Sequence, residues 1–157
     1  MPQTTKSPLK KVLLLIPEIP APRKVAMAVS IATDRYKQLT NLWLPVIMCM
    51  GFIFYASSIT GQDIPSLFPH EDILFHGAIY AILALFFYRA LKNTCPRLIR
   101  MKLFLFTVIF GFAYGSSDEF HQMFTPDRDC SGFDLIVDTI GSCVGGFIGG
   151  IFHKWLK

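Results

Sequence analysis

The sequence predicts an all-α polytopic membrane protein: a compact bundle of four transmembrane helices with both termini in the cytoplasm. The first observation is composition, because 52% of the 157 residues are hydrophobic and only 17% are charged. The second is that the apolar residues gather in four stretches close to the length of about 20 residues that a helix needs to cross a bilayer. The third is the distribution of charge between these stretches. The length of the chain allows one domain.

The four stretches run over residues 42–59, 73–90, 103–115 and 134–152. The third is the shortest and continues into a polar extension, and the fourth is rich in glycine and contains Asp138. Gly141, Gly145 and Gly149 recur at every fourth position, a spacing that lets helix backbones approach closely. This spacing suits packing within the bundle or a homodimer interface, and we favour packing within the bundle.

Charge is distributed unevenly among the connecting segments. Fourteen of the fifteen Lys and Arg residues lie before the first stretch, between Arg89 at the end of the second and the start of the third, or after the fourth; Arg128 is the exception. Nine of the eleven Asp and Glu residues lie in the opposite loops or at the adjoining helix ends. The positive-inside rule therefore predicts cytoplasmic termini and acidic loops on the outside. The net charge of +4 reflects this topology, so we expect no nucleic-acid partner.

The chain divides into a transmembrane domain and a cytoplasmic segment on each side of it. Residues 1–41 form a basic, proline-containing tail, residues 42–152 the transmembrane domain, and residues 153–157 a short basic end. The apolar run 12–16 is too short for a signal-peptide core, and Met27 is an alternative start. The four cysteines form neither a disulfide framework nor a CxxC metal motif.

Polar residues recur at helical spacing on the outer ends of three stretches. Asp72, His76 and Tyr80 are spaced i, i+4 and i+8, so they share one helix face. Asp134 and Asp138 form a similar pair at the start of the last stretch. A third face follows the third stretch, with the residues Asp118, Glu119, His121 and Gln122. Ionisable residues in spans usually face the bundle interior or an aqueous cavity, so we expect an outward-facing polar pocket.

We divide the members of this predicted pocket by the chemistry of their side chains. The candidate catalytic residues, as general acids or bases, are His76, Asp118, Glu119 and Asp134. The candidate binding residues are Asp72, His121, Gln122, Arg128, Ser131 and Asp138.

Each assignment has a structural alternative. His76 would also suit a hydrogen bond inside the bundle, and Tyr80 a purely structural role. Asp118 and Asp134 would also suit ordinary helix ends, and Arg128 a surface ion pair with its acidic neighbours. The two histidines and several carboxylates would suit a divalent cation, but no HExxH or comparable spacing occurs. We therefore assign no metal ligands, and the cofactor stays unknown.

The same residues carry a resemblance to a known family. The chain contains "LWLPVIMCMGFIFYASS", "DILFHGAIY" and "SDEFHQMFTPDRDCSGFDLIVDTIG", and over about residues 42–150 it resembles the VanZ-like family of small bacterial membrane proteins. The last segment is the most specific, because it matches the Asp-Glu-x-x-Gln, Pro-x-Arg and Ser-x-x-Asp elements of the family pattern. The matching positions are Asp118, Glu119, Gln122, Pro126, Arg128, Ser131 and Asp134.

Three positions depart from the family pattern. The chain has Ile73 where the family commonly has Lys, Asp127 where it often has Gly, and Asp138 where it usually has Asn. The last departure adds a titratable group inside a span.

The family is named for an accessory factor in resistance to the glycopeptide antibiotic teicoplanin. The resemblance therefore implies a protein of the bacterial cytoplasmic membrane and cell envelope, whose outer pocket binds or modifies a cell-wall precursor, a lipid headgroup or a glycopeptide. The alternative is a membrane-embedded enzyme that acts on an amphiphilic envelope substrate by acid–base or metal-assisted chemistry. The lipid bilayer is the one partner common to both readings, and the oligomeric state stays open.

Overall fold

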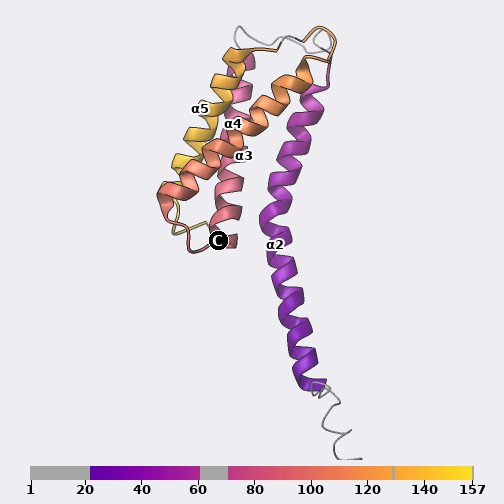
Figure 1. Cartoon of the computed structure of the whole chain (residues 1–157), viewed down its shortest axis with the longest axis vertical. Helices are drawn as coiled ribbons and strands as arrows, with labels where there is room; N and C mark the ends of the chain where they lie inside the picture. Colours follow the sequence, from indigo (N-terminus) through magenta and orange to yellow (C-terminus); the bar gives the residue numbers. More distant parts are fainter. Residues whose placement is uncertain (1–21, 61–70, 129, 157) are drawn as a thin grey trace, which may run out of the picture. The chain divides into compact units, whose positions relative to one another are not determined.

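The computed structural model describes residues 22–60, 71–128 and 130–156, without the side chains of Pro22, Glu71 and Asp72. Within these ranges the chain forms four α-helices and no strand: α2 (Pro22–Ser57), α3 (Glu71–Thr94), α4 (Arg100–Gln122) and α5 (Gly132–Ile151) (Figure 1). The all-α prediction is confirmed. Residues 1–21 of the predicted tail, including the apolar run 12–16, and Lys157 lie outside the described residues.

The chain divides into two units, Met1–Tyr36 and Lys37–Lys157. The described part of the first unit is the N-terminal half of α2, so the segment that the sequence assigns to a tail is helical from Pro22 onward. The second unit contains the rest of α2 together with α3, α4 and α5. Every site residue discussed below belongs to this second unit.

Three helices in the described part are long and apolar enough to cross a membrane. They are Arg23–Ser57, Ile73–Thr94 and Gly132–Ile151. The remaining helix, α4, has 23 residues, but its apolar stretch gives way to the polar sequence Ser-Ser-Asp-Glu before the helix ends. The structure thus has the apolar helices of a membrane protein.

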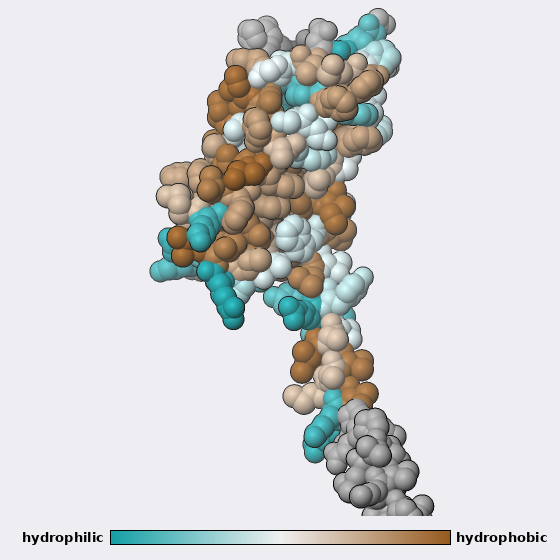
Figure 2. All heavy atoms as spheres, viewed as in Figure 1, coloured by the Kyte–Doolittle hydropathy of each residue, from teal (hydrophilic) through white to brown (hydrophobic). Residues whose placement is uncertain are grey.

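Large apolar side chains cover much of the helix surface instead of being buried. Figure 2 shows a largely brown, apolar surface over the middle of the bundle, with hydrophilic residues at its ends. The exposed residues include Leu74, Phe75, Ile82, Leu105, Ile109, Phe112, Ile140 and Phe147. A soluble monomer rarely exposes so much contiguous apolar surface, whereas lipid solvates it.

The glycines of α5 allow the backbone of this helix to approach α3. A Cβ atom on Gly141 would lie 2.3 Å from the carbonyl oxygen of Gly77, and one on Gly145 would lie 2.1 Å from that of Ala81. Any side chain at these two positions would therefore clash with backbone atoms of α3. The small-residue spacing serves packing within the bundle, in agreement with the favoured prediction.

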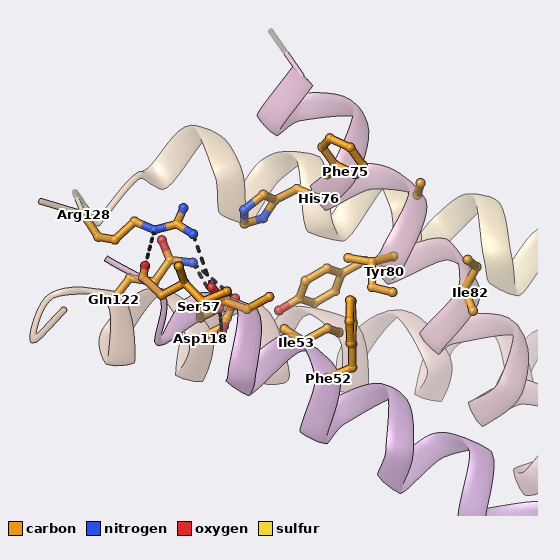
Figure 3. A pocket seen from close by; sticks show the side chains of 14 residues that line it. Phe52, Ile53, Ser57, Phe75, His76, Tyr80, Ile82, Asp118, Gln122 and Arg128 are labelled. Atoms are coloured by element: carbon orange, nitrogen blue, oxygen red, sulfur yellow. Dashed lines mark hydrogen bonds between the residues drawn. The ribbon is translucent and has the colours of Figure 1, made fainter. Parts of the chain in front are cut away.

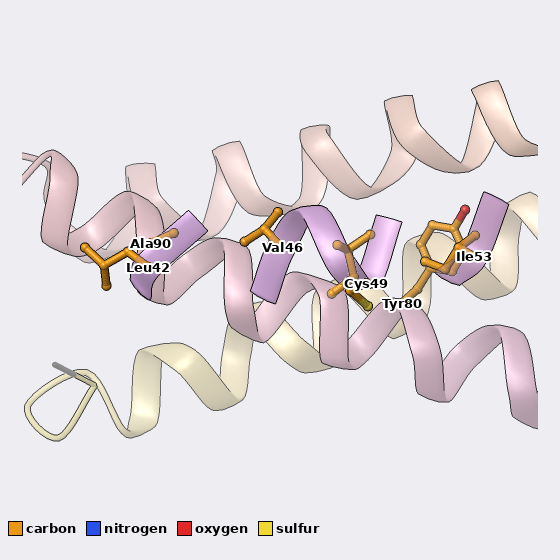
Figure 4. Packing of buried hydrophobic residues seen from close by; sticks show 7 residues of the cluster. Leu42, Val46, Cys49, Ile53, Tyr80 and Ala90 are labelled. Carbon is orange, nitrogen blue, oxygen red and sulfur yellow. The ribbon is translucent and has the colours of Figure 1, made fainter. Parts of the chain in front are cut away.

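One face of α2 packs on α3 through a ladder of apolar residues (Figure 4). Leu42, Val46, Cys49 and Ile53 of α2 cluster with Tyr80, Leu83 and Ala90 of α3. At one end of this ladder, Trp43 Nε1 donates a hydrogen bond of 3.0 Å to Thr94 Oγ1. The C-terminal end of α2 is consequently brought to the N-terminal end of α3.

The end of the bundle marked by Trp43 and Thr94 is basic. Lys92 Nζ donates hydrogen bonds to the carbonyl oxygens of His153 and Leu156, and the hydroxyl of Tyr88 lies 2.9 Å from His153 Nδ1. Burial lowers the pKa of His153, and the charges of Lys92 and Arg100 lower it further. The carboxylates of the predicted site lie at the opposite end of the helices, so the two ends differ in charge as the sequence predicts.

Candidate functional site

The polar site forms where α2 and α4 end and α3 and α5 begin. Because successive helices run in opposite directions, these four ends meet although they are far apart in the sequence. The side chains that they bring together fall into two buried groups, one around Asp118 and one around Asp138.

Asp118 is buried in the last turns of α4, with 4% of its surface exposed. The hydroxyl of Ser57, near the end of α2, donates a hydrogen bond of 2.6 Å to Asp118 Oδ1. Gln122 lies one turn further along α4, and its Nε2 is 3.4 Å from both Asp118 Oδ2 and Ser57 Oγ. This group ties α2 to α4 through a satisfied carboxylate.

Asp138 is completely buried in α5, and it pairs with His76 of α3. His76 Nδ1 lies 3.0 Å from Asp138 Oδ1, and 16% of the His76 side chain is exposed. The other oxygen, Asp138 Oδ2, has no hydrogen-bond partner among the described residues. Gly115 of α4 makes room for this carboxylate, because a Cβ atom there would lie 3.1 Å from Asp138 Oδ2.

Glu119 connects α4 to the start of α5. Its Oε2 accepts a hydrogen bond of 2.6 Å from the backbone N–H of Ser131, which precedes α5. Ser131 is the N-cap of α5, and its hydroxyl accepts a bond of 3.2 Å from the backbone N–H of Asp134. A carboxylate beside a helix N-terminus also interacts favourably with the helix dipole. Glu119 Oε1, in contrast, is buried without a partner in the described part of the chain.

His76, Glu119 and Asp138 come from three different helices and converge on one point. One potential ligand atom from each residue lies within 4.8 Å of the other two. We call these three residues the buried triad. The hydroxyls of Tyr80 and Ser142 are likewise buried without a partner in the described ranges.

Arg128 donates hydrogen bonds at the C-terminal end of α2. Its Nε and one terminal nitrogen each lie 3.3 Å from a backbone carbonyl oxygen, those of Ile59 and Ala56 respectively. Carbonyl groups at a helix C-terminus lack partners within the helix, so a cation is stabilising there. The preceding residue, Asp127, has φ 56°, in the left-handed region that favours glycine.

His121 and Asp134 are not members of the buried triad. His121 Nε2 is 3.0 Å from Ser58 Oγ, and its ring stacks on Phe54 with centroids 4.4 Å apart. Asp134 is half-buried in the first turn of α5, one turn before Asp138. Asp72 also belongs to the predicted set, but its side chain lies outside the described residues.

A pocket of about 480 Å³ opens between α2 and α3 (Figure 3). One end of this α2–α3 pocket is polar, and Figure 3 shows the hydroxyl of Tyr80 pointing toward Asp118. The polar lining residues are Ser57, His76, Tyr80, Asp118, Gln122 and Arg128. The remaining wall is apolar and includes Phe52, Ile53, Phe75, Ile79 and Ile82. Phe52, Phe75 and Ile82 are also exposed on the outside of the bundle, so the apolar side of the pocket faces the surroundings of the helices.

The sequence analysis missed two members of the site. Ser57 lies on α2, and its bond to Asp118 depends on the packing of α2 against α4, which helical spacing does not predict. Ser142 lies four residues after Asp138, so continuing the polar face of α5 by one turn would have included it.

Comparison with known proteins identifies the family of the chain. Neither curated proteins nor solved structures gave a match. A protein-family model described as VanZ/LLP1 matches residues 42–153, which include the C-terminal part of α2 and all of α3, α4 and α5. The matched segment holds every residue of the two buried groups and confirms the resemblance drawn from the sequence. The chain belongs to the VanZ/LLP1 family.

Proposed function

We propose that this protein holds an amphiphilic component of the bacterial cell envelope in the α2–α3 pocket. In this proposal, residues 42–152 cross the cytoplasmic membrane four times, and the segments 1–41 and 153–157 lie in the cytoplasm. The polar end of the pocket then opens at the outer face of the membrane. The bound component is a lipid headgroup or a lipid-linked cell-wall precursor.

The observation that supports this proposal is the two-part lining of the pocket. Ser57, Asp118 and Gln122 present hydrogen-bonding groups at one end, and Phe52, Phe75 and Ile82 form an apolar wall that reaches the helix surface. A ligand with a polar head and a hydrocarbon chain matches both parts at once. A small polar solute would leave the apolar wall uncovered.

The polar end favours a headgroup that both accepts and donates hydrogen bonds. Asp118 offers carboxylate oxygens as acceptors, and Gln122 offers an amide. Arg128 lines the same pocket, and a guanidinium suits phosphate or carboxylate groups. A phosphorylated or glycosylated lipid head satisfies this combination.

A link to glycopeptide resistance follows from the family resemblance. In this proposal the polar end of the pocket opens at the outer face of the membrane, where it would meet a cell-wall precursor or a glycopeptide. A protein that holds a precursor or alters its surroundings there would lessen the effect of the drug. We propose this accessory role for the chain.

Drug susceptibility tests the proposed role in cells. Host cells that express the wild type, His76→Ala, Glu119→Gln or Ala78→Phe at equal membrane levels are compared with cells that lack the protein. We expect the wild type to change teicoplanin susceptibility or the lipid composition, and each variant to abolish that change. If the variants act like the wild type, the pocket has no part in the effect. If the wild type has no effect on susceptibility or on lipids, the resistance role fails.

A second candidate function, an enzyme, is favoured by the pair formed by His76 and Asp138. An imidazole oriented by a buried carboxylate is the usual arrangement of a general base, and His76 also lines the pocket. Asp118, Glu119 and Asp134 are the other candidate acid–base groups. This function is tested by incubating the purified protein with envelope lipid extract and measuring how much of each lipid remains. If the protein is an enzyme, the wild type should consume one lipid species and the His76→Asn variant should not.

A further inference from the structure

We infer that His76, Glu119 and Asp138 bind a divalent transition-metal ion of the Zn²⁺ or Mn²⁺ type. This inference concerns the buried triad itself and does not depend on which molecule occupies the α2–α3 pocket. Three observations support it: the convergence of the ligand atoms, the carboxylate oxygens without partners, and the local balance of charge.

The positions of the three residues suit a common ion. One potential ligand atom from each lies within 4.8 Å of the others, and His76 Nδ1 is already 3.0 Å from Asp138 Oδ1. Zinc bonds to nitrogen and oxygen are about 2.0–2.2 Å long, so two ligands of one ion lie roughly 3–4 Å apart. Shifts of about an ångström in side-chain position would complete the coordination.

The buried oxygen atoms indicate a missing partner. Glu119 Oε1 and Asp138 Oδ2 have no hydrogen bond within the described ranges, although the two residues are 4% and 0% exposed. A buried polar atom without a partner costs free energy, and native structures contain few of them. Two such atoms on adjacent carboxylates, beside an imidazole, are explained together by one bound cation.

The charge of the triad also supports a bound cation. Two carboxylates buried next to each other repel unless protons or cations compensate them. Arg128, the described cation on this side of the pocket, directs its guanidinium to the carbonyl oxygens of Ile59 and Ala56. A divalent ion would balance both carboxylates and leave His76 neutral, as a metal ligand requires.

The donor set indicates the type of metal. Imidazole suits Zn²⁺ and other transition metals, whereas Ca²⁺ and Mg²⁺ prefer sites made of oxygen alone. Carboxylates suit Mn²⁺ as well as Zn²⁺. Three protein ligands leave at least one position for water or for another molecule. His76 lines the α2–α3 pocket, so this position is accessible from that side.

Metal binding to the purified full chain tests the inference. The protein in detergent is stripped with a chelator and dialysed against Zn²⁺ and, separately, Mn²⁺, and bound metal per chain is measured. We expect one ion per chain and a rise in thermal unfolding temperature with either metal. Changes next to metal ligands weaken binding by about 10–100-fold, so His76→Ala, Glu119→Gln and Asp138→Asn should each weaken it by at least about 100-fold.

Matched variants control for folding and for other metal-binding groups. His121→Ala removes another histidine at the same end of the bundle, so it should bind metal like the wild type. The Mn²⁺ measurement excludes binding by the four cysteines, because Mn²⁺ prefers oxygen ligands. Ala78→Phe, which narrows the pocket, should keep the ion, and this separates the metal site from the proposed lipid site.

Two results would overturn the inference. One is a folded wild-type protein that binds neither metal. The other is binding that stays unchanged in every folded variant of the triad. A folded wild-type protein that binds no metal overturns the inference by itself, and one triad variant that folds is enough to assign bound metal to the triad.

Discussion

His76 of α3 and Asp138 of α5 lie 3.0 Å apart, between Nδ1 and Oδ1, and Asp138 is wholly inaccessible to solvent. The two residues are separated by 62 positions in the sequence. Their contact joins α3 and α5 at the polar end of the bundle, where Asp138 is buried beside Glu119. The pair therefore combines a contact between two helices with a buried ionisable group.

Removal of His76 should destabilise the protein strongly. His76→Ala leaves the Asp138 carboxylate buried without its partner, which typically costs about 3–5 kcal/mol. Replacement of both residues by leucine should recover much of this loss, because apolar pairs of similar volume are tolerated in place of buried ion pairs. Thermal unfolding of the purified protein in detergent measures both effects.

His121→Ala is the control for His76→Ala, since His121 lies at the same end of the bundle and is only half-buried. His121→Ala should lower the free energy of unfolding by about 1 kcal/mol, which is the centre of the distribution for single substitutions. Equal losses of stability in the two variants would mean that the contact between His76 and Asp138 does not contribute more than an ordinary side chain.

Packing of α5 on α3 predicts different effects for different glycines of the same helix. Gly141→Ala and Gly145→Ala place a methyl group against the carbonyl oxygens of Gly77 and Ala81, and such overpacking typically costs about 1–3 kcal/mol. At Gly150 a Cβ atom would meet nothing within 4 Å. Gly150→Ala should therefore be neutral or slightly stabilising by helix propensity. The three unfolding temperatures test this order, and a loss at Gly150 as large as at Gly141 would contradict it.

The left-handed backbone of Asp127 gives a third prediction. Its φ of 56° is tolerated by Asp and suits Gly, but it costs about 1–2 kcal/mol for a residue such as Ala. Asp127→Gly should keep or raise stability, and Asp127→Ala should lower it. If both substitutions behave alike, the side chain of Asp127 rather than its backbone conformation matters.

The proposed topology is testable with cysteines that the chain already has. Cys130 is exposed at the acidic end of the bundle, and Cys95 lies at the basic end between α3 and α4. A membrane-impermeant maleimide should label Cys130 in intact cells and Cys95 only after the membrane is opened. Cys130→Ser and Cys95→Ser identify the two signals. Labelling of Cys95 in intact cells would reverse the orientation that the positive-inside rule predicts.

The sequence predicts the helices well because hydrophobic length determines them. The predicted stretch 73–90 corresponds to α3 (Glu71–Thr94), and the stretch 134–152 corresponds to α5 (Gly132–Ile151). α4 extends to Gln122, beyond the predicted apolar run, because its polar residues Asp118, Glu119 and Gln122 are buried among the other helices. α2 begins at Pro22, well before the predicted stretch.

Helical spacing predicts which residues share a face, but not which residues pair. Asp134 and Asp138 are one turn apart, yet Asp138 meets His76 whereas Asp134 lies in the capped first turn of α5. Asp118 and Glu119 are neighbours in the sequence, but Asp118 contacts α2 and Glu119 contacts the start of α5. These differences depend on helix rotation and on backbone distance, which glycines such as Gly115 and Gly141 control.

The most direct test of the proposed function is a search for an amphiphile bound to the purified protein. Protein extracted gently from host membranes is analysed by mass spectrometry for co-purified lipids, in the wild type, Ala78→Phe and Ala113→Phe. Ala78 lines the α2–α3 pocket, and Ala113 is an exposed residue of α4 that does not line it. We predict one enriched phosphorylated or glycosylated lipid in the wild type and in Ala113→Phe, and its loss in Ala78→Phe. The same lipid profile in all three proteins would contradict a ligand in this pocket.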